Sequence, residues 1–161
     1  MEFKVVITLG DLMTMAGLAA GSIGLFLTWI SMRTGNRQKR AEFLVSMLQR
    51  FTSDDEMMTT YYQVEYGKFE YGEEFHESEG EKSLDKLLRF YDTIGKLWEM
   101  GCITMEDVRF FAYEYLVVFQ DESVGKYMSF LEDWFKKRGM SVRPFGAFQR
   151  LGVRLEGEFF Q

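Results

Sequence analysis

The 161-residue chain contains one cysteine, one proline and one histidine, and it has no charged residue between Leu12 and Met32. The single cysteine, Cys102, excludes an intramolecular disulfide, which fits a reducing compartment. Because no second cysteine or adjacent histidine accompanies it, Cys102 is expected to be a small buried hydrophobic residue just beyond a helix end. Pro144 is the only proline, so at most one helix can be interrupted by proline.

The uncharged segment has the length of a membrane-spanning helix. Its 21 residues, at about 1.5 Å each, give a helix of roughly 32 Å, which matches the hydrocarbon core of a bilayer. The segment lacks the preceding positive charges, the shorter apolar run and the small-residue cleavage site of a signal peptide. We therefore expect residues 1–35 to form an uncleaved membrane anchor, with a single span over about residues 12–32.

Small residues recur along this segment at spacings that alternate between four and three. Between Gly10 and Gly35 they are Thr14, Gly17, Gly21, Gly24, Thr28 and Ser31. Such residues allow close backbone approach and hydrogen bonding between helices in lipid, although small residues are also common in membrane spans for other reasons. The spacing favours a homo-oligomer that assembles through the span.

Basic residues follow the span directly, at Arg33, Arg37, Lys39 and Arg40. Lysine and arginine stay on the cytoplasmic side of a membrane, so we expect the N-terminus outside and the body of the protein in the cytoplasm. The cluster is also expected to contact anionic lipid at the inner leaflet. The lipid bilayer is therefore the first expected partner.

The segment 36–139 is predicted to be a compact cytoplasmic domain of about four to five helices. Apolar residues recur at helical spacing over 40–51 and 124–135, and most clearly over 84–98, where Gly101 supplies a left-handed stop. No segment alternates convincingly as a strand, apart from a short stretch within residues 66–75. The whole chain is therefore predicted to be all-α.

Capping residues place the starts of these helices. Ser53 and Ser78 each stand three residues before a glutamate, Glu56 and Glu81, which is the pattern of a capping box. Thr104 is expected to cap a further helix whose first turn is acidic. These positions divide the domain into successive helices joined by short connections.

Charge is segregated along the chain. Residues 33–52 hold five basic and one acidic residue, a net charge of +4, whereas residues 53–133 hold seven basic and twenty acidic residues, a net charge of −13. Such an acidic body disfavours binding to nucleic acid. The tail, 140–161, mixes arginines with phenylalanines, which suits packing on its own domain or a neighbouring copy, or contact with a lipid surface.

The glutamate-rich stretch from residue 66 to residue 81 is the best candidate for a specific site. It contains the only histidine, and the candidate ligand or partner residues are Tyr66, Tyr71, His76 and Glu77. One histidine with scattered carboxylates could hold a divalent ion or provide a base for bound water. A solvated acidic connector with a structural histidine is the favoured interpretation, and no metal or cofactor is expected.

The chain also resembles a known family. The pattern YGxFxYxxxFHxSxxE over residues 66–81, followed by DxLLxxxDxIGxLxxxG over 85–101, carries the similarity, which extends over roughly residues 50–131. It is similar to a bacterial family of small single-span proteins with a helical cytoplasmic domain of unknown function. The resemblance implies an inner-membrane, single-pass protein and transfers no catalytic residue.

Two classes of function remain open from the sequence. In the first, the protein is a membrane-anchored, non-catalytic homo-oligomer that binds a cytoplasmic protein or a small-molecule signal. A sharper version is a membrane-perturbing effector in bacterial phage defence, motivated by the polar positions of the span. In the second, the domain is a metal-dependent or hydrolytic enzyme that uses the glutamate-rich segment around His76.

Overall fold

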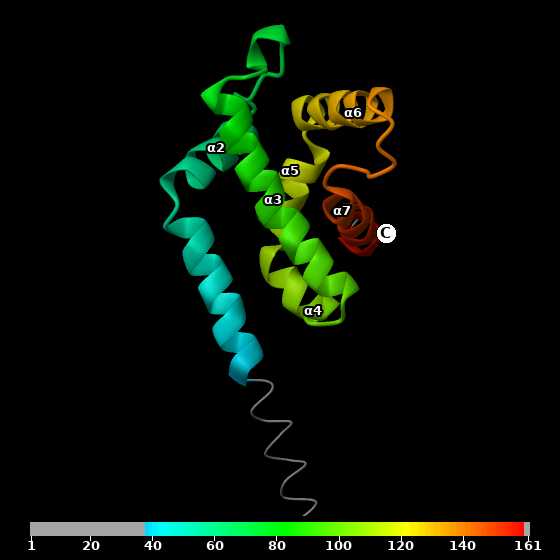
Figure 1. Cartoon of the computed structure of the whole chain (residues 1–161). Helices are drawn as coiled ribbons and strands as arrows, with labels where there is room; N and C mark the ends of the chain where they lie inside the picture. The colour runs from blue at the N-terminus through cyan, green and yellow to red at the C-terminus, as the bar shows by residue number, and fades with distance from the viewer. Residues whose placement is uncertain (1–37, 160–161) are drawn as a thin grey trace, which may run out of the picture. The chain divides into compact units, whose positions relative to one another are not determined.

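The computed structural model describes residues 38–159, and in this range the chain is all helix, turn and connecting loop, with no strand. The all-α prediction is confirmed there. Residues 38–52 are helical. The elements that follow are α2 (Asp55–Glu65), η1 (Glu73–Phe75), α3 (Glu79–Glu99), α4 (Met105–Val108), η2 (Arg109–Phe111), α5 (Ala112–Gln120), α6 (Glu122–Lys137) and α7 (Gly146–Phe159) (Figure 1).

The chain divides into two units, residues 1–45 and residues 46–161. The predicted span, its small-residue positions, Arg33 and Arg37 lie outside the described residues. Of the first unit, the structure describes only 38–45, which are helical and include Lys39 and Arg40. No helix within residues 38–159 is long and apolar enough to cross a bilayer.

Helix α3 is the central element of the second unit and packs against both α2 and α7 (Figure 1). Its leucines at 84, 87 and 88, together with Tyr91 and Ile94, are buried. These positions follow the helical period, so one face of α3 supplies much of the hydrophobic core. The predicted amphipathic segment over residues 84–98 is thereby confirmed.

The C-terminal residues form helix α7, which packs on α3 and α5 of its own unit. At Gly95 the helix backbones approach closely, because a Cβ added there would lie 2.5 Å from the Ala147 carbonyl oxygen. The Tyr115 hydroxyl donates to the Phe148 carbonyl oxygen at 2.9 Å. Phe148, Leu151 and Leu155 of the tail thus belong to the hydrophobic core of the second unit.

The helix caps agree with the sequence at two positions and differ at a third. Thr104 caps α4 in a complete capping box with Asp107, and Ser78 caps α3 by accepting from the Glu81 N–H. The predicted cap Ser53 is wrong, because the Asp54 side chain accepts from the Met57 N–H instead. An aspartate one residue nearer the helix therefore takes the capping position.

The connection after α3 confirms one prediction and corrects another. Gly101 has a φ of 70°, the left-handed conformation expected at a helix end. The adjacent Cys102 is exposed, so the expectation that it is a buried hydrophobic residue is wrong. Ile103 fills the buried position beyond the turn.

Candidate functional site

A groove of about 1100 Å³ lies within the second unit, between α3, α6 and the segment that leads into α7. Along α3 its wall is formed by Glu81, Asp85, Arg89, Asp92 and Lys96. These residues recur every three or four positions and therefore share one face of the helix. Over fifteen residues at about 1.5 Å each, this wall is about 22 Å long.

Helix α6 supplies an apolar wall to the same groove. The wall consists of four half-buried side chains, Phe130, Leu131, Trp134 and Phe135. Of the helices described, α6 packs mainly against α5. The Arg138 guanidinium lies 3.7 Å from the centre of the Trp134 ring, which is a cation–π contact.

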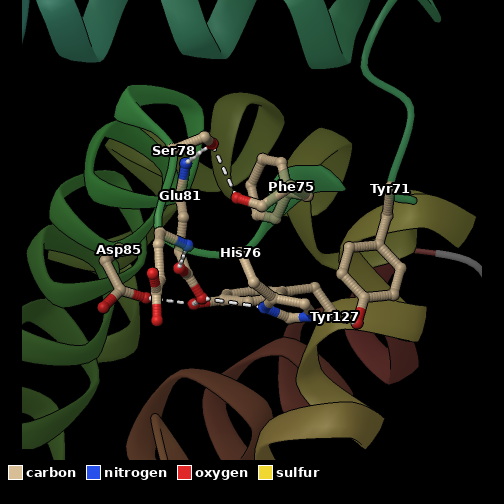
Figure 2. Close-up of polar contacts among 8 residues, drawn as sticks. Tyr71, Phe75, His76, Ser78, Glu81, Asp85 and Tyr127 are labelled. Atoms are coloured by element: carbon tan, nitrogen blue, oxygen red, sulfur yellow. Dashed lines mark hydrogen bonds and ion pairs between the residues drawn. The ribbon is translucent and has the colours of Figure 1, made fainter. Parts of the chain in front are cut away.

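A hydrogen-bonded chain of side chains lies at one end of the groove (Figure 2). The Tyr71 hydroxyl lies 2.9 Å from His76 Nε2, and His76 Nδ1 lies 3.2 Å from Glu81 Oε1. Because a carboxylate accepts hydrogen bonds, it favours a proton on Nδ1, so Nε2 accepts from the phenol. The imidazole also lies against the Phe130 ring, with 4.0 Å between the ring centres.

Tyr127 of α6 links two carboxylates of α3 at this end (Figure 2). Its hydroxyl lies 3.1 Å from Glu81 Oε1 and 2.9 Å from Asp85 Oδ1. One phenolic hydrogen is shared between two acceptors, and burial together with these carboxylates raises the pKa of Tyr127. The phenol is therefore a hydrogen-bond donor that holds both carboxylates in place.

The two carboxylates differ in their electrostatic environment. Burial raises the pKa of Asp85 above its ordinary value of 3.8, and the hydrogen bond from Tyr127 offsets only part of this effect. Burial also acts to raise the pKa of Glu81, but donors from Glu77, His76 and Tyr127 outweigh it, and the pKa falls below 4.5. Negative charge is thus well accommodated at Glu81 and poorly accommodated at Asp85.

Two non-glycine residues with positive φ both line this groove. Glu77 has a φ of 63° and Phe145 a φ of 48°, and within residues 38–159 no other non-glycine residue adopts a positive φ. At Glu77 the strained backbone directs its N–H to Glu81 Oε2, at 2.7 Å. Holding a non-glycine residue in the left-handed backbone conformation costs free energy, and such residues cluster at binding and active sites.

The opposite end of the groove is basic, but its cations are paired. Lys96 Nζ lies 2.7 Å from Asp92 Oδ2, and Arg143 Nε lies 2.7 Å from Glu132 Oε1. Arg150 Nε lies 2.5 Å from Glu99 Oε1. Each positive charge at this end therefore has a neighbouring carboxylate.

The structure brings three of the four predicted site residues together. His76 and Glu77 line the acidic end of the groove, and Tyr71 is hydrogen-bonded to His76. Tyr66 instead stacks on Tyr62 at the end of α2, with 5.5 Å between the ring centres. Lys68 Nζ lies 5.7 Å from the centre of the Tyr66 ring. Within residues 38–159, no group of three or more histidine, cysteine, aspartate or glutamate residues could hold a metal ion.

Asp85, Tyr127 and the aromatic wall of α6 were not predicted from the sequence as site residues. The four-residue step from Glu81 to Asp85 was a usable signal, because it places two carboxylates on one face of a helix. Tyr127 and Trp134 follow the apolar stripe of α6, so periodicity alone assigns them to the core. Tyr127 is indeed buried, whereas the partial exposure of Trp134 depends on where α6 lies relative to α3.

Comparison of the chain with protein-family models, with curated proteins and with solved structures finds no match. The similarity to the bacterial single-span family stays a prediction.

Proposed function

We propose that the chain is a membrane-anchored, non-catalytic helical protein that forms homo-oligomers and binds a cytoplasmic partner or signal in the groove between α3 and α6. The observation that carries the proposal is the pair of facing walls. Half-exposed aromatic side chains of α6 lie opposite a line of charged side chains on α3. Apolar surface beside a few convergent polar groups is typical of a binding site.

The hydrogen bonding at the acidic end favours binding over catalysis. His76 Nε2 is occupied by Tyr71, and Glu81 accepts from three different groups. Burial and the charge of Glu81 raise the pKa of Tyr71, which opposes its activation as a nucleophile. These groups hold one another in place, as expected of a preorganised recognition surface.

Membrane anchoring is supported by the sequence. The uncharged 21 residues from Leu12 to Met32 and the basic residues after them favour a single span with a cytoplasmic domain. We expect the full chain to stay in the membrane fraction after a carbonate wash. Recovery of the chain in the supernatant would contradict the anchor but would leave the groove proposal standing.

Site-specific photo-crosslinking in cells tests the groove. Leu131, on the groove wall, is replaced by p-benzoylphenylalanine, and the matched control places the same residue at Asp133, on the exposed face of α6. We expect a discrete adduct from position 131 and none from 133. Equal adducts from both positions, or none from either, would contradict binding in the groove.

A second candidate function, an enzyme, is favoured by the Tyr71–His76–Glu81 chain. A histidine oriented by a carboxylate and bonded to a hydroxyl has the order of a nucleophile, base and orienting group. This candidate predicts turnover of p-nitrophenyl acetate, or a rise in melting temperature with Zn²⁺, that His76→Ala removes in a folded protein. Unchanged rates and melting temperatures would argue against it.

A further inference from the structure

The charges lining the groove are unbalanced at one end. Within residues 38–159, the exposed Glu77 carboxylate has no ion-pair partner. Asp85 pairs with Arg89, whose Nη2 lies 3.8 Å from Asp85 Oδ2 on a side chain that is 74% exposed. A pair at this distance and exposure contributes little. His76 is directed at Glu81, so negative charge remains at Glu77 and Asp85.

The shape of the groove favours an elongated occupant. Its α3 wall runs through four helical turns, from Glu81 to Lys96, over about 22 Å. This length equals about seven residues of extended chain, at about 3.3 Å each. The apolar wall of α6 lies along the same groove, so an occupant can meet charge and apolar surface together.

We propose that the groove binds a peptide segment of a partner protein, which presents lysine or arginine to Glu77 and Asp85 and apolar side chains to Phe130 and Trp134. This inference rests on the proposed function and names the chemistry of the partner. Guanidinium and ammonium groups complement the two carboxylates at the acidic end. Tryptophan is one of the residue types that contribute most of the binding energy at protein interfaces, and Trp134 is half-buried.

The paired cations at the other end of the groove limit where the basic residues of the partner segment can lie. Lys96, Arg143 and Arg150 would repel a second basic group there, although each has a carboxylate partner. The basic residues of the partner segment therefore lie at one end of it, and the apolar residues follow. The groove therefore favours a particular arrangement of charge along the segment as well as a composition.

The test uses the full chain in nanodiscs of zwitterionic lipid and two fluorescein-labelled peptides of about ten residues. One peptide has two arginines followed by leucines and alanines, and the other has glutamates in place of the arginines. Fluorescence anisotropy, after subtraction of empty nanodiscs, measures binding. We expect the arginine peptide to bind at least about tenfold more tightly than the glutamate peptide.

Three variants locate the binding. The double variant Glu77→Gln with Asp85→Asn is expected to weaken the arginine peptide about tenfold, and Trp134→Ala by at least about tenfold. Asp133→Asn, outside the groove, is the control and should leave binding unchanged. Circular dichroism confirms that each variant folds, and Asp85→Asn keeps an acceptor for Tyr127.

Two results would overturn this inference, and the first of them would leave the groove proposal intact. One is equal binding of both peptides at a groove that Trp134→Ala still weakens. The other is a photo-crosslink from position 131 that joins two copies of the chain, which assigns the groove to self-association. Absence of peptide binding together with absence of any crosslink would overturn both proposals.

Discussion

Asp92 of α3 caps helix α7 through the backbone of Ala147, which lies 55 residues further along the chain: Oδ1 accepts from the Ala147 N–H at 3.0 Å, and also from the Phe148 N–H at 3.1 Å. The other oxygen pairs with Lys96 at 2.7 Å. A buried aspartate thus satisfies the first N–H groups of a distant helix. The contact fixes the start of α7, and with it the segment 142–147 that borders the groove.

Asp92→Ala is therefore expected to destabilise the domain by about 3 kcal/mol, because two buried N–H groups lose a charged acceptor. Urea denaturation monitored by circular dichroism measures the change. The matched control is Asp133→Ala, whose exposed carboxylate only approaches Lys136 at 3.5 Å and should matter by less than about 0.5 kcal/mol. Equal effects of the two substitutions would contradict the cap.

Glycines at 95 and 125 predict substitutions of opposite sign. A Cβ at Gly95 would meet the Ala147 carbonyl oxygen at 2.5 Å, so Gly95→Ala should separate α3 from α7 and destabilise the domain by about 2 kcal/mol or more. Gly125 lies in α6 with nothing within 4 Å, and Gly125→Ala should stabilise by up to about 1 kcal/mol. Thermal melting of both variants checks the signs.

Tyr91 and Tyr115 form a second matched pair. Both phenols are buried, but the Tyr91 hydroxyl has no hydrogen-bond partner within residues 38–159, whereas the Tyr115 hydroxyl donates to Phe148. Tyr91→Phe should raise the free energy of unfolding by about 1 kcal/mol, and Tyr115→Phe should lower it by about 1 kcal/mol. Chemical denaturation of the two variants measures both. A loss of stability in Tyr91→Phe would mean that its hydroxyl is satisfied.

The sequence predicts the local features of this domain well. Periodicity locates α3, and Thr104, Ser78 and Gly101 mark helix ends, because each depends on neighbours within a few residues. The cap of α7 could not be predicted in this way, since its acceptor, Asp92, comes from another helix. Local propensity carries no information about such a partner.

The candidate site shows the same division between local features, which the sequence predicts, and contacts between distant helices, which it does not. Tyr71, His76 and Glu77 fall within one short stretch that composition alone makes conspicuous. Tyr127 comes from α6 and joins them only through tertiary packing, which no spacing along the chain reveals. Tyr66 lies in the same stretch but is the C-cap residue of α2, where its ring stacks on that of Tyr62.

The carboxylates that share Tyr127 should respond to pH in opposite ways. The pKa of Glu81 in the folded protein lies below its ordinary value of 4.5, so its ionised form stabilises the fold above that pH, and the stabilisation is lost as the pH falls further. The pKa of Asp85 lies above 3.8, so its ionised form opposes folding at neutral pH, and this cost disappears in acid.

Glu81→Gln is therefore expected to lower the free energy of unfolding at pH 7 by about 2 kcal/mol, with a smaller effect near about pH 3. Asp85→Asn should instead raise it at pH 7 by up to about 1 kcal/mol, and this gain should also vanish in acid, where wild-type Asp85 is neutral. Urea denaturation from neutral to acid pH measures both differences. Effects of the same sign at pH 7 would show that the two carboxylates share one environment, and the assignment of Asp85 as the poorly compensated charge would then fail.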